Sequence, residues 1–200
     1  MKKLLTFSAI IFISFTAKSQ LDKGDWLVGG NASFKSYNAK FDATTVSTEY
    51  KTTDLQIAPN VGYFLADKFA IGVRSTFSWI KNTGISANAG KSNTIRIDYG
   101  PFARFYFLDK EKSVNLLADL SYQFGNLKFL NKDKGIRNTL RVMAGSVVYF
   151  NSSIGLEFLA GYQVEKEKLT KSTSTPAYLY TDTKSGFQIS VGFQIYLQNL

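Results

Sequence analysis

The sequence predicts an all-β protein, an eight-stranded antiparallel up-and-down β-barrel, and three observations support this fold class. Residues that favour strands are abundant, with 17 Phe and 11 Tyr against 3 Pro in 200 residues. Eight segments alternate apolar and polar residues with the period of two that a strand produces. The connections between these segments alternate between short and long. An even number of antiparallel strands can close into a ring that leaves no open edge.

The chain begins with a segment that has the features of a secretory signal peptide, residues 1–19. Two lysines supply its positive start, an apolar run follows, and small residues stand before the expected cut at Ala17 and Ser19. The apolar run is shorter than the about 20 residues that a membrane-spanning helix needs. Residues 20–200 are therefore expected to form one exported domain, which could cross a membrane only as strands.

The eight expected strands share one property: apolar side chains occupy every second position. The fourth is the clearest, because its charged residues Arg96, Asp98 and Arg104 fall on one face, whereas a helix would distribute them around its circumference. The strands are expected within Trp26–Lys35, Leu55–Tyr63, Phe69–Trp79, Ile95–Phe107, Val114–Gly125, Thr139–Phe150, Ile154–Gln163 and Phe187–Leu197.

The sixth segment has the weakest alternation. Val147 to Phe150 are apolar at four successive positions, so the pattern does not separate two faces there. We assign the outward face to Met143, Val147 and Tyr149.

The connections indicate how the barrel is oriented. Strands two to three, four to five and six to seven are joined by short turns at 65–68, 108–113 and 151–153. Long polar loops are expected at 36–51, 81–92, 126–138 and 165–185. An up-and-down barrel places all four long loops at one end, an asymmetry typical of outer-membrane barrels, whose long loops are extracellular.

Alternation alone does not tell which face lies inside, because a soluble lipocalin-type barrel lines its cavity with the apolar face. Here the polar face carries Gly, Ser, Asn and Gln, which suit a crowded lumen, together with charges of both signs that can pair. Aromatic residues gather at strand ends, as in the interfacial girdles of membrane barrels. These features favour apolar side chains facing lipid and leave the soluble ligand-binding barrel as an alternative.

With its signal peptide and eight strands, the chain resembles the small outer-membrane β-barrel family that includes the OmpA transmembrane domain, OmpX and OmpW. The last strand also resembles the assembly signal of such barrels, with Ser190, Gly192, Ile195 and Leu197 in the matching positions. The resemblance implies location in the outer membrane of a Gram-negative cell, insertion by the barrel-assembly machinery, and a monomer. Unlike full-length OmpA, the chain is not expected to carry a peptidoglycan-binding domain after the barrel.

The composition limits which reactions and binding sites the chain could support. The chain contains no Cys, which excludes disulfides and thiolate sites, and no His, the commonest general base and metal ligand near neutral pH. Small barrel enzymes that act on lipid A resemble this chain in size, but their chemistry uses His. The net charge of +9 forms no continuous basic stripe. We therefore expect no enzymatic activity, no catalytic, metal or cofactor site, and no nucleic-acid partner.

Six charged residues are expected to point into the lumen. An eight-stranded barrel has an interior that side chains just fill, and buried charges must pair there. We predict that these residues form a structural plug, with a narrow channel as the alternative reading. They are Arg74, Arg96, Asp98, Arg104, Asp119 and Glu157.

The long loops carry many basic residues. One interpretation is contact with the phosphates of lipopolysaccharide, and the other is a merely solvated surface. The candidate contact residues are Lys128, Lys132, Lys134, Arg137, Lys166 and Lys168. The sequence thus predicts a non-enzymatic outer-membrane barrel that is structural or binds partners through its loops, in contact with outer-membrane lipid and lipopolysaccharide, with an OmpW-like narrow channel for small molecules as the alternative.

Overall fold

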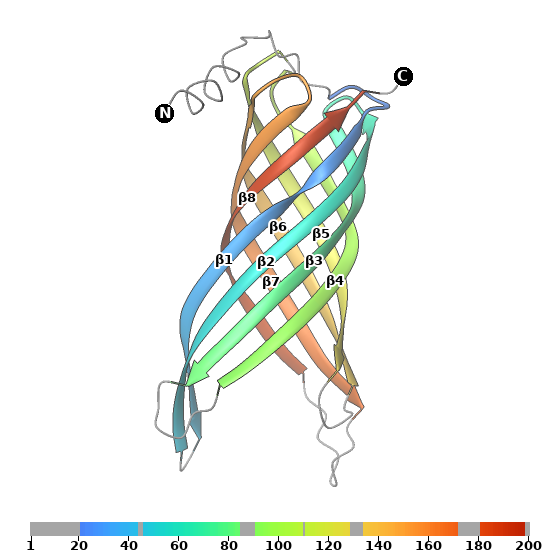
Figure 1. The fold of residues 1–200 in the computed structure, drawn as a ribbon. Coiled ribbons are helices and arrows are strands. Elements are labelled where there is room, and N and C mark those ends of the chain that lie inside the picture. Colours follow the sequence, from blue (N-terminus) through green and yellow to red (C-terminus); the bar gives the residue numbers. More distant parts are fainter. Residues whose placement is uncertain are drawn as a thin grey trace, which may run out of the picture.

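Eight strands form one closed antiparallel sheet in the computed structural model, each strand pairing with its neighbours in sequence order and the last with the first (Figure 1). The predicted fold class is confirmed. The structure describes residues 21–43, 46–84, 91–109, 111–128, 134–171 and 181–198, so the expected signal peptide lies outside the described residues. The strands are β1 (Trp26–Ala43), β2 (Val46–Ala66), β3 (Phe69–Gly84), β4 (Lys91–Tyr106), β5 (Val114–Lys128), β6 (Lys134–Tyr149), β7 (Ile154–Lys171) and β8 (Thr181–Leu197).

The two ends of the barrel differ as the sequence predicts. The connections β2–β3, β4–β5 and β6–β7 are short and lie at the end where β1 begins and β8 ends, at the top of Figure 1. We call this the short-turn end and the opposite one the long-loop end. The β2–β3 turn is held by Lys68, a non-glycine residue with a positive φ of 66°. Within the described residues, no helix is long and apolar enough to span a membrane.

The strands continue well past their predicted limits at the long-loop end. β1 extends to Ala43 and β2 begins at Val46, which shortens the connection between them. The other three long connections are shortened in the same way. The expected loops at 36–51, 81–92, 126–138 and 165–185 are therefore wrong in their bounds. The physical reason is that a backbone ladder continues wherever two neighbouring strands run on together, whether or not apolar side chains mark it.

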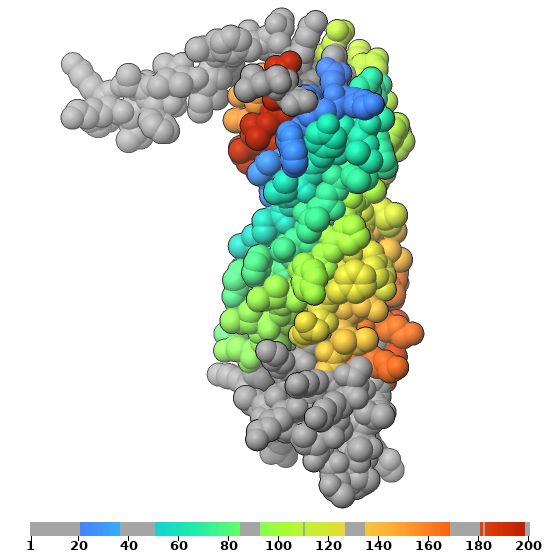
Figure 2. Space-filling model, turned by 90° about the vertical axis from the view of Figure 1, so that its right-hand side faces the viewer, coloured from blue at the N-terminus to red at the C-terminus, as the bar shows by residue number. Residues whose placement is uncertain are grey.

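Side chains alternate between the lumen and the outer wall. Large apolar residues remain exposed on the outer wall over all eight strands, among them Trp26, Ile57, Val73, Ile97, Leu120, Val142, Phe158 and Val191. Figure 2 shows part of this outer surface, with the strands crossing it obliquely. The lumen holds Arg, Asp, Glu, Gln, Ser and Thr, many of them fully buried. A soluble barrel with an apolar interior would have the opposite arrangement, so that alternative is not supported by this structure.

The outward face assigned to the end of β6 is wrong. Met143, Val147 and Tyr149 point into the lumen and are at most 6% exposed, while Val142 and Phe150 face outward. The lumen at the short-turn end is itself apolar and aromatic, because Val147 and Tyr149 pack there with Tyr106 and Tyr196 and their neighbours. Both faces of β6 are therefore apolar at this end, and hydrophobicity could not distinguish them.

Candidate functional site

An ion-pair cluster lies in the lumen between the short-turn end and the barrel's middle. Arg104 and Asp119 are register partners on β4 and β5, and β3 supplies Arg74. The Arg74 guanidinium donates two parallel hydrogen bonds to the Asp119 carboxylate, both of 2.7 Å. Arg104 donates through Nε to the same carboxylate at 3.0 Å. Two guanidinium groups thus share one fully buried Asp, a geometry that makes strong charge-assisted hydrogen bonds.

A second carboxylate completes this cluster. Arg104 Nη1 lies 2.6 Å from Glu157 Oε1 on β7, and both side chains are 0% exposed. The other Glu157 oxygen accepts from Gln194 at 3.2 Å and from Asn31 at 3.4 Å. Phe102 lies under the guanidiniums of Arg74 and Arg104, with ring-centre distances of 4.8 and 5.7 Å. Two charges of each sign are therefore packed together and largely compensated.

Next to this cluster, on its long-loop side, Arg141 occupies the lumen. Its guanidinium donates to the side-chain oxygens of Gln163 at 2.9 Å and Thr76 at 3.1 Å, and also to Gln123. All of these hydrogen-bond partners are neutral, and Gln123 is itself tied to the Arg74 carbonyl at 3.1 Å. This second layer bridges strands on several sides of the barrel and fills its middle.

A third layer of charges lies at the long-loop end. Arg137 donates to both oxygens of Asp98, and it also contacts Glu165 at 3.3 Å. Arg96 Nη1 lies 3.0 Å from both Glu165 and Glu167. Lys184, on β8, contacts Glu167 from the side at 3.7 Å. This layer is also a compensated network of opposite charges.

All six residues predicted to face the lumen do point there, but they divide between two clusters. Arg74, Arg104, Asp119 and Glu157 belong to the cluster nearer the short-turn end, and Arg96 and Asp98 belong to the layer at the long-loop end. Four further charged residues of the lumen stand in a predicted loop or on the weakly alternating sixth strand, so the prediction does not include them among the lumen charges. These are Arg137, Arg141, Glu165 and Glu167.

The assignment of Arg137 to a surface loop is wrong. Its side chain is 3% exposed and lies inside the barrel against Asp98. Arg137, Thr139 and Arg141 alternate with outward Ile136, Leu140 and Val142, so the strand period continued into the region read as a loop. This continued alternation is the feature of the sequence that indicates a lumen position for Arg137.

The remaining lysines proposed for surface contact lie at the long-loop end of β5, β6 and β7. Lys166 and Lys168 are exposed on β7, and Lys132 lies outside the described residues. The ladders pair Lys128 with Lys134 and Lys134 with Lys171.

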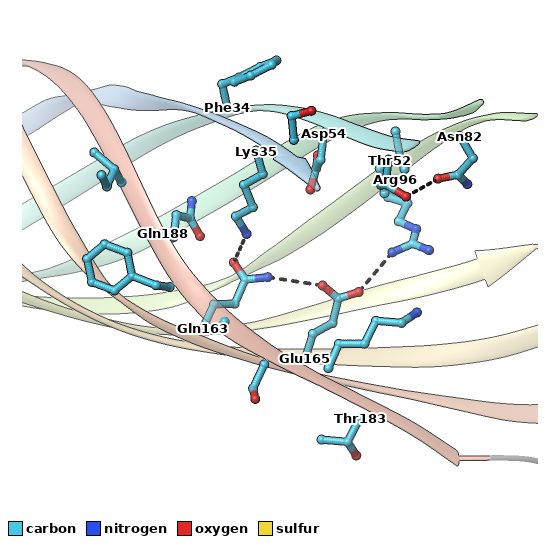
Figure 3. A pocket seen from close by; sticks show the side chains of 17 residues that line it. Phe34, Lys35, Thr52, Asp54, Asn82, Arg96, Gln163, Glu165, Thr183 and Gln188 are labelled. Carbon is cyan, nitrogen blue, oxygen red and sulfur yellow. Dashed lines mark hydrogen bonds and ion pairs between the residues drawn. The ribbon is translucent and has the colours of Figure 1, made fainter. Parts of the chain in front are cut away.

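A cavity of about 1170 Å³ opens in the lumen at the long-loop end (Figure 3). Its wall includes both lumen-facing charges and outward-facing apolar side chains, the latter from β1 and β8. Lys35 and Gln163 meet inside it, with 3.4 Å between Nζ and Oε1. Among the described residues, no group of His, Cys, Asp or Glu is arranged to hold a metal ion.

The fold is similar to those of two solved structures. The crystal structure of the outer membrane protein OprG from Pseudomonas aeruginosa aligns with a TM-score of 0.60 and 13% identity, covering 92% of this chain and 100% of that chain. The N-terminal β-barrel domain of Pseudomonas aeruginosa OprF aligns with a TM-score of 0.42 and 12% identity, covering 88% and 98%. No family model and no curated protein matches the chain. The likeness to OprG shows that this chain has the barrel fold of an outer-membrane protein.

Proposed function

We propose that this protein is an integral outer-membrane barrel, without enzymatic activity, whose lumen is closed and whose long-loop end binds partners at the cell surface. The exposed apolar residues around all eight strands support insertion in a bilayer. Closure of the sheet supports it too, because an unpaired backbone group in hydrocarbon costs several kcal/mol. The strands have 15 to 21 residues, more than the about 9–11 that a membrane needs, so they project beyond it.

The observation that carries the closed lumen is the buried pairing of Arg104 with Asp119 and Glu157. These groups occupy the cross-section where a channel would have to pass, and their side chains are 0% exposed. Opening a path there would separate opposite charges that have left water, which is strongly unfavourable. The tyrosines between this cluster and the short-turn end add a second obstruction, since the Tyr106 and Tyr196 hydroxyls lie 3.1 Å apart.

Planar-bilayer recording tests the closed lumen. We expect the purified wild-type barrel to give no discrete conductance steps at neutral pH. Steady single-channel openings of the wild type would overturn the proposal and favour a channel. Thermal unfolding of the same preparation in detergent, followed by the shift in gel migration on heating, establishes that the barrel is folded.

Surface binding is supported by Lys166 and Lys168, which are exposed on β7 at the long-loop end. We propose that Lys128, Lys132, Lys134, Lys166 and Lys168 contact the phosphates of lipopolysaccharide. Replacing Lys166 and Lys168 with Gln should weaken lipopolysaccharide binding, and added salt should weaken it in the wild type. Lys112→Gln, at the short-turn end, is the matched control. Binding that is indifferent to salt would contradict this contact. We further propose that the barrel is a monomer inserted by the barrel-assembly machinery.

A narrow conduit is the second candidate, and the cavity at the long-loop end favours it. The cavity wall includes Phe34 and Phe187, which also face outward, so a small molecule could leave sideways instead of through the plug. Uptake of a small apolar dye into liposomes that contain the barrel separates this candidate from the first. Uptake equal to that of empty liposomes excludes it.

A further inference from the structure

The cavity at the long-loop end extends through the barrel wall. The ladder between β1 and β8 runs from Trp26–Leu197 to Ser33–Ser190 and stops there, although both strands continue. The next residues on either side, Phe34 to Ser36 and Phe187 to Ile189, all line the cavity. In this described part of the chain, the two strands therefore leave a gap, which we call the β1–β8 gap.

The outer mouth of this gap is apolar. Phe34, Phe187 and Ile189 are 64%, 65% and 63% exposed, although they also line the cavity. Phe34 ends the outward apolar series of β1, and Phe187 begins that of β8. The mouth thus lies at the border of the apolar outer wall on the long-loop side, where the hydrocarbon of a membrane leaflet meets its head groups.

The inner side of the gap is charged. Lys35 on β1 and Asp54 on β2 are register partners, they line the cavity and they carry opposite charges. Each has another partner: Lys35 donates to Gln163 at 3.4 Å, and Asp54 Oδ2 accepts from Gln56 at 2.8 Å. Asp54 Oδ1 is buried without a hydrogen-bond donor. The gap therefore offers one ammonium and one carboxylate oxygen to a ligand.

A second acceptor lies across the gap from Lys35. Gln188 on β8 donates through Nε2 to Ser33 at 2.8 Å, and its Oε1 is buried without a donor. In Figure 3, Lys35 is drawn between Gln188 and Asp54. Other charges in the wall already contact each other, as Arg96 does Glu165 at 3.0 Å. Arg96 Nε is nevertheless buried without an acceptor, so the wall offers Lys35 and this second cationic donor together with two acceptors.

We propose that the cavity binds the zwitterionic head of a membrane amphiphile, whose acyl chain leaves through the β1–β8 gap. The anionic part of the head lies near Lys35, its ammonium group donates to Asp54 and Gln188, and the chain passes Phe34, Phe187 and Ile189. The proposal goes beyond the closed lumen proposed above and rests on it in one respect, because the plugged lumen is the floor of the cavity.

Other ligand classes fit these groups less well. A purely apolar molecule would leave the Asp54 and Gln188 oxygens without donors, a cost comparable to a lost hydrogen bond for each. A purely anionic head would meet Lys35 but also the Asp54 carboxylate. A soluble zwitterion would satisfy the charged groups and leave the apolar mouth unused. Both halves of an amphiphile have a counterpart here, and the volume of about 1170 Å³ accommodates its head.

The lipid that the barrel retains shows which head group the cavity prefers. The full barrel is placed in nanodiscs of equal parts phosphatidylethanolamine, which is zwitterionic, and phosphatidylglycerol, which is anionic, and is then released into detergent for native mass spectrometry. We expect the wild type to retain phosphatidylethanolamine and Asp54→Asn to retain about tenfold less, since a charge-assisted hydrogen bond is lost. Asp109→Asn, at the short-turn end, is the matched control and should retain as much as the wild type.

A disulfide across the gap tests the exit of the chain, in a protein that has no cysteine of its own. Phe34 and Ile189 would be partners if the ladder continued by one pair, so F34C with I189C should close the mouth when oxidised. We expect oxidation to abolish retention and reduction to restore it. A32C with V191C locks a pair that is already joined and should change nothing.

Three results would overturn the proposal. The first is equal retention of both lipids by the wild type, and the second is undiminished retention by Asp54→Asn. The third is displacement of the lipid by soluble phosphoethanolamine at the same concentration as by the intact lipid, which would remove the role of the chain. None of these results depends on conductance, so they leave the proposal of a closed lumen to the planar-bilayer recording described above. Where F34C/I189C does not fold, the Asp54→Asn comparison decides.

Discussion

The guanidinium of Arg104 on β4 reaches past two strands to the carboxylate of Glu157 on β7, with 2.6 Å between Nη1 and Oε1. The same guanidinium holds Asp119 on the neighbouring strand at 2.9 Å. A single Arg therefore ties two walls of the barrel together, in a region where all three side chains are removed from solvent. The stability of the barrel should depend strongly on these contacts.

Removing Asp119 should destabilise the barrel severely. Asp119→Ala leaves Arg74 and Arg104 buried without their shared carboxylate, and breaking a buried pair costs about 3–5 kcal/mol. We expect a lower unfolding temperature in detergent, measured by gel migration after heating. Asp109→Ala is the control, since its ion pair with Lys68 is exposed and should contribute little. An unchanged unfolding temperature together with altered conductance would favour the channel over the plug.

Arg104 and Glu157 should be energetically coupled. Arg104→Met and Glu157→Gln each leave one partner buried and uncompensated, whereas the double variant removes both groups. We expect the double variant to lose less free energy of unfolding than the two single losses combined, by about 1–3 kcal/mol. Urea unfolding followed by tryptophan fluorescence gives the three differences. Additivity within about 0.5 kcal/mol would mean that the contact contributes nothing of its own.

Gly72 makes room for Phe102 inside the lumen. A Cβ at position 72 would lie 2.1 Å from the Val61 carbonyl oxygen and 2.6 Å from the Phe102 ring. Gly72→Ala should therefore destabilise the barrel by about 1–3 kcal/mol, the usual cost of overpacking. Gly186→Ala is the matched control, because no atom lies within 4 Å of a Cβ there. Equal unfolding free energies of the two variants would contradict the steric argument.

Asp109 and Lys68 join two turns at the short-turn end, with 2.6 Å between Oδ1 and Nζ. The hydrogen bond from Lys68, and then its charge, lower the pKa of Asp109 from its ordinary value of 3.8. A lowered pKa in the folded state stabilises the fold above the ordinary pKa, and this contribution is lost as the pH falls through the lowered value. Carboxyl NMR titration in micelles should show Lys68→Met raising the Asp109 pKa.

Lys112→Met is the control for that titration. The Lys112 charge also lowers the pKa of Asp109, but it is the weakest of the causes. The pKa should therefore rise less than in Lys68→Met. A larger rise in Lys112→Met than in Lys68→Met would show that Lys68 does not hold the carboxylate.

The sequence predicts the faces of a strand well where charge and apolarity alternate together. On β4 and β5, Arg104 and Asp119 stand among apolar neighbours, so each strand has one unmistakable lumen face. At the end of β6 both faces are apolar, because the lumen there is packed with tyrosines, and the assignment of Val147 failed. Hydrophobicity reports contact with water or lipid, but it cannot separate lipid from an apolar interior.

The candidate site was only partly predictable for a related reason. Around Arg137 the period of two is visible in the outward residues Ile136 and Leu140, whereas around Glu165 polar residues on both faces of the strand end conceal it. The β1–β8 gap had no sequence signal, because Phe34 and Ile189 continue the alternation across the point where the ladder stops. Pairing between distant strands is a property of the closed sheet, and local patterns do not contain it.

Closure of the sheet joins the first strand to the last, so the cylinder is sealed only when β1 meets β8. Until that ladder forms, β1 and β8 each present a bare row of hydrogen-bonding groups, which can associate with other chains. Only eight residue pairs accomplish the sealing, over the shortest ladder that β1 forms. The seven pairs between β4 and β5 form a second short ladder, so the cylinder has two weak seams, on opposite sides, at which it would first reopen.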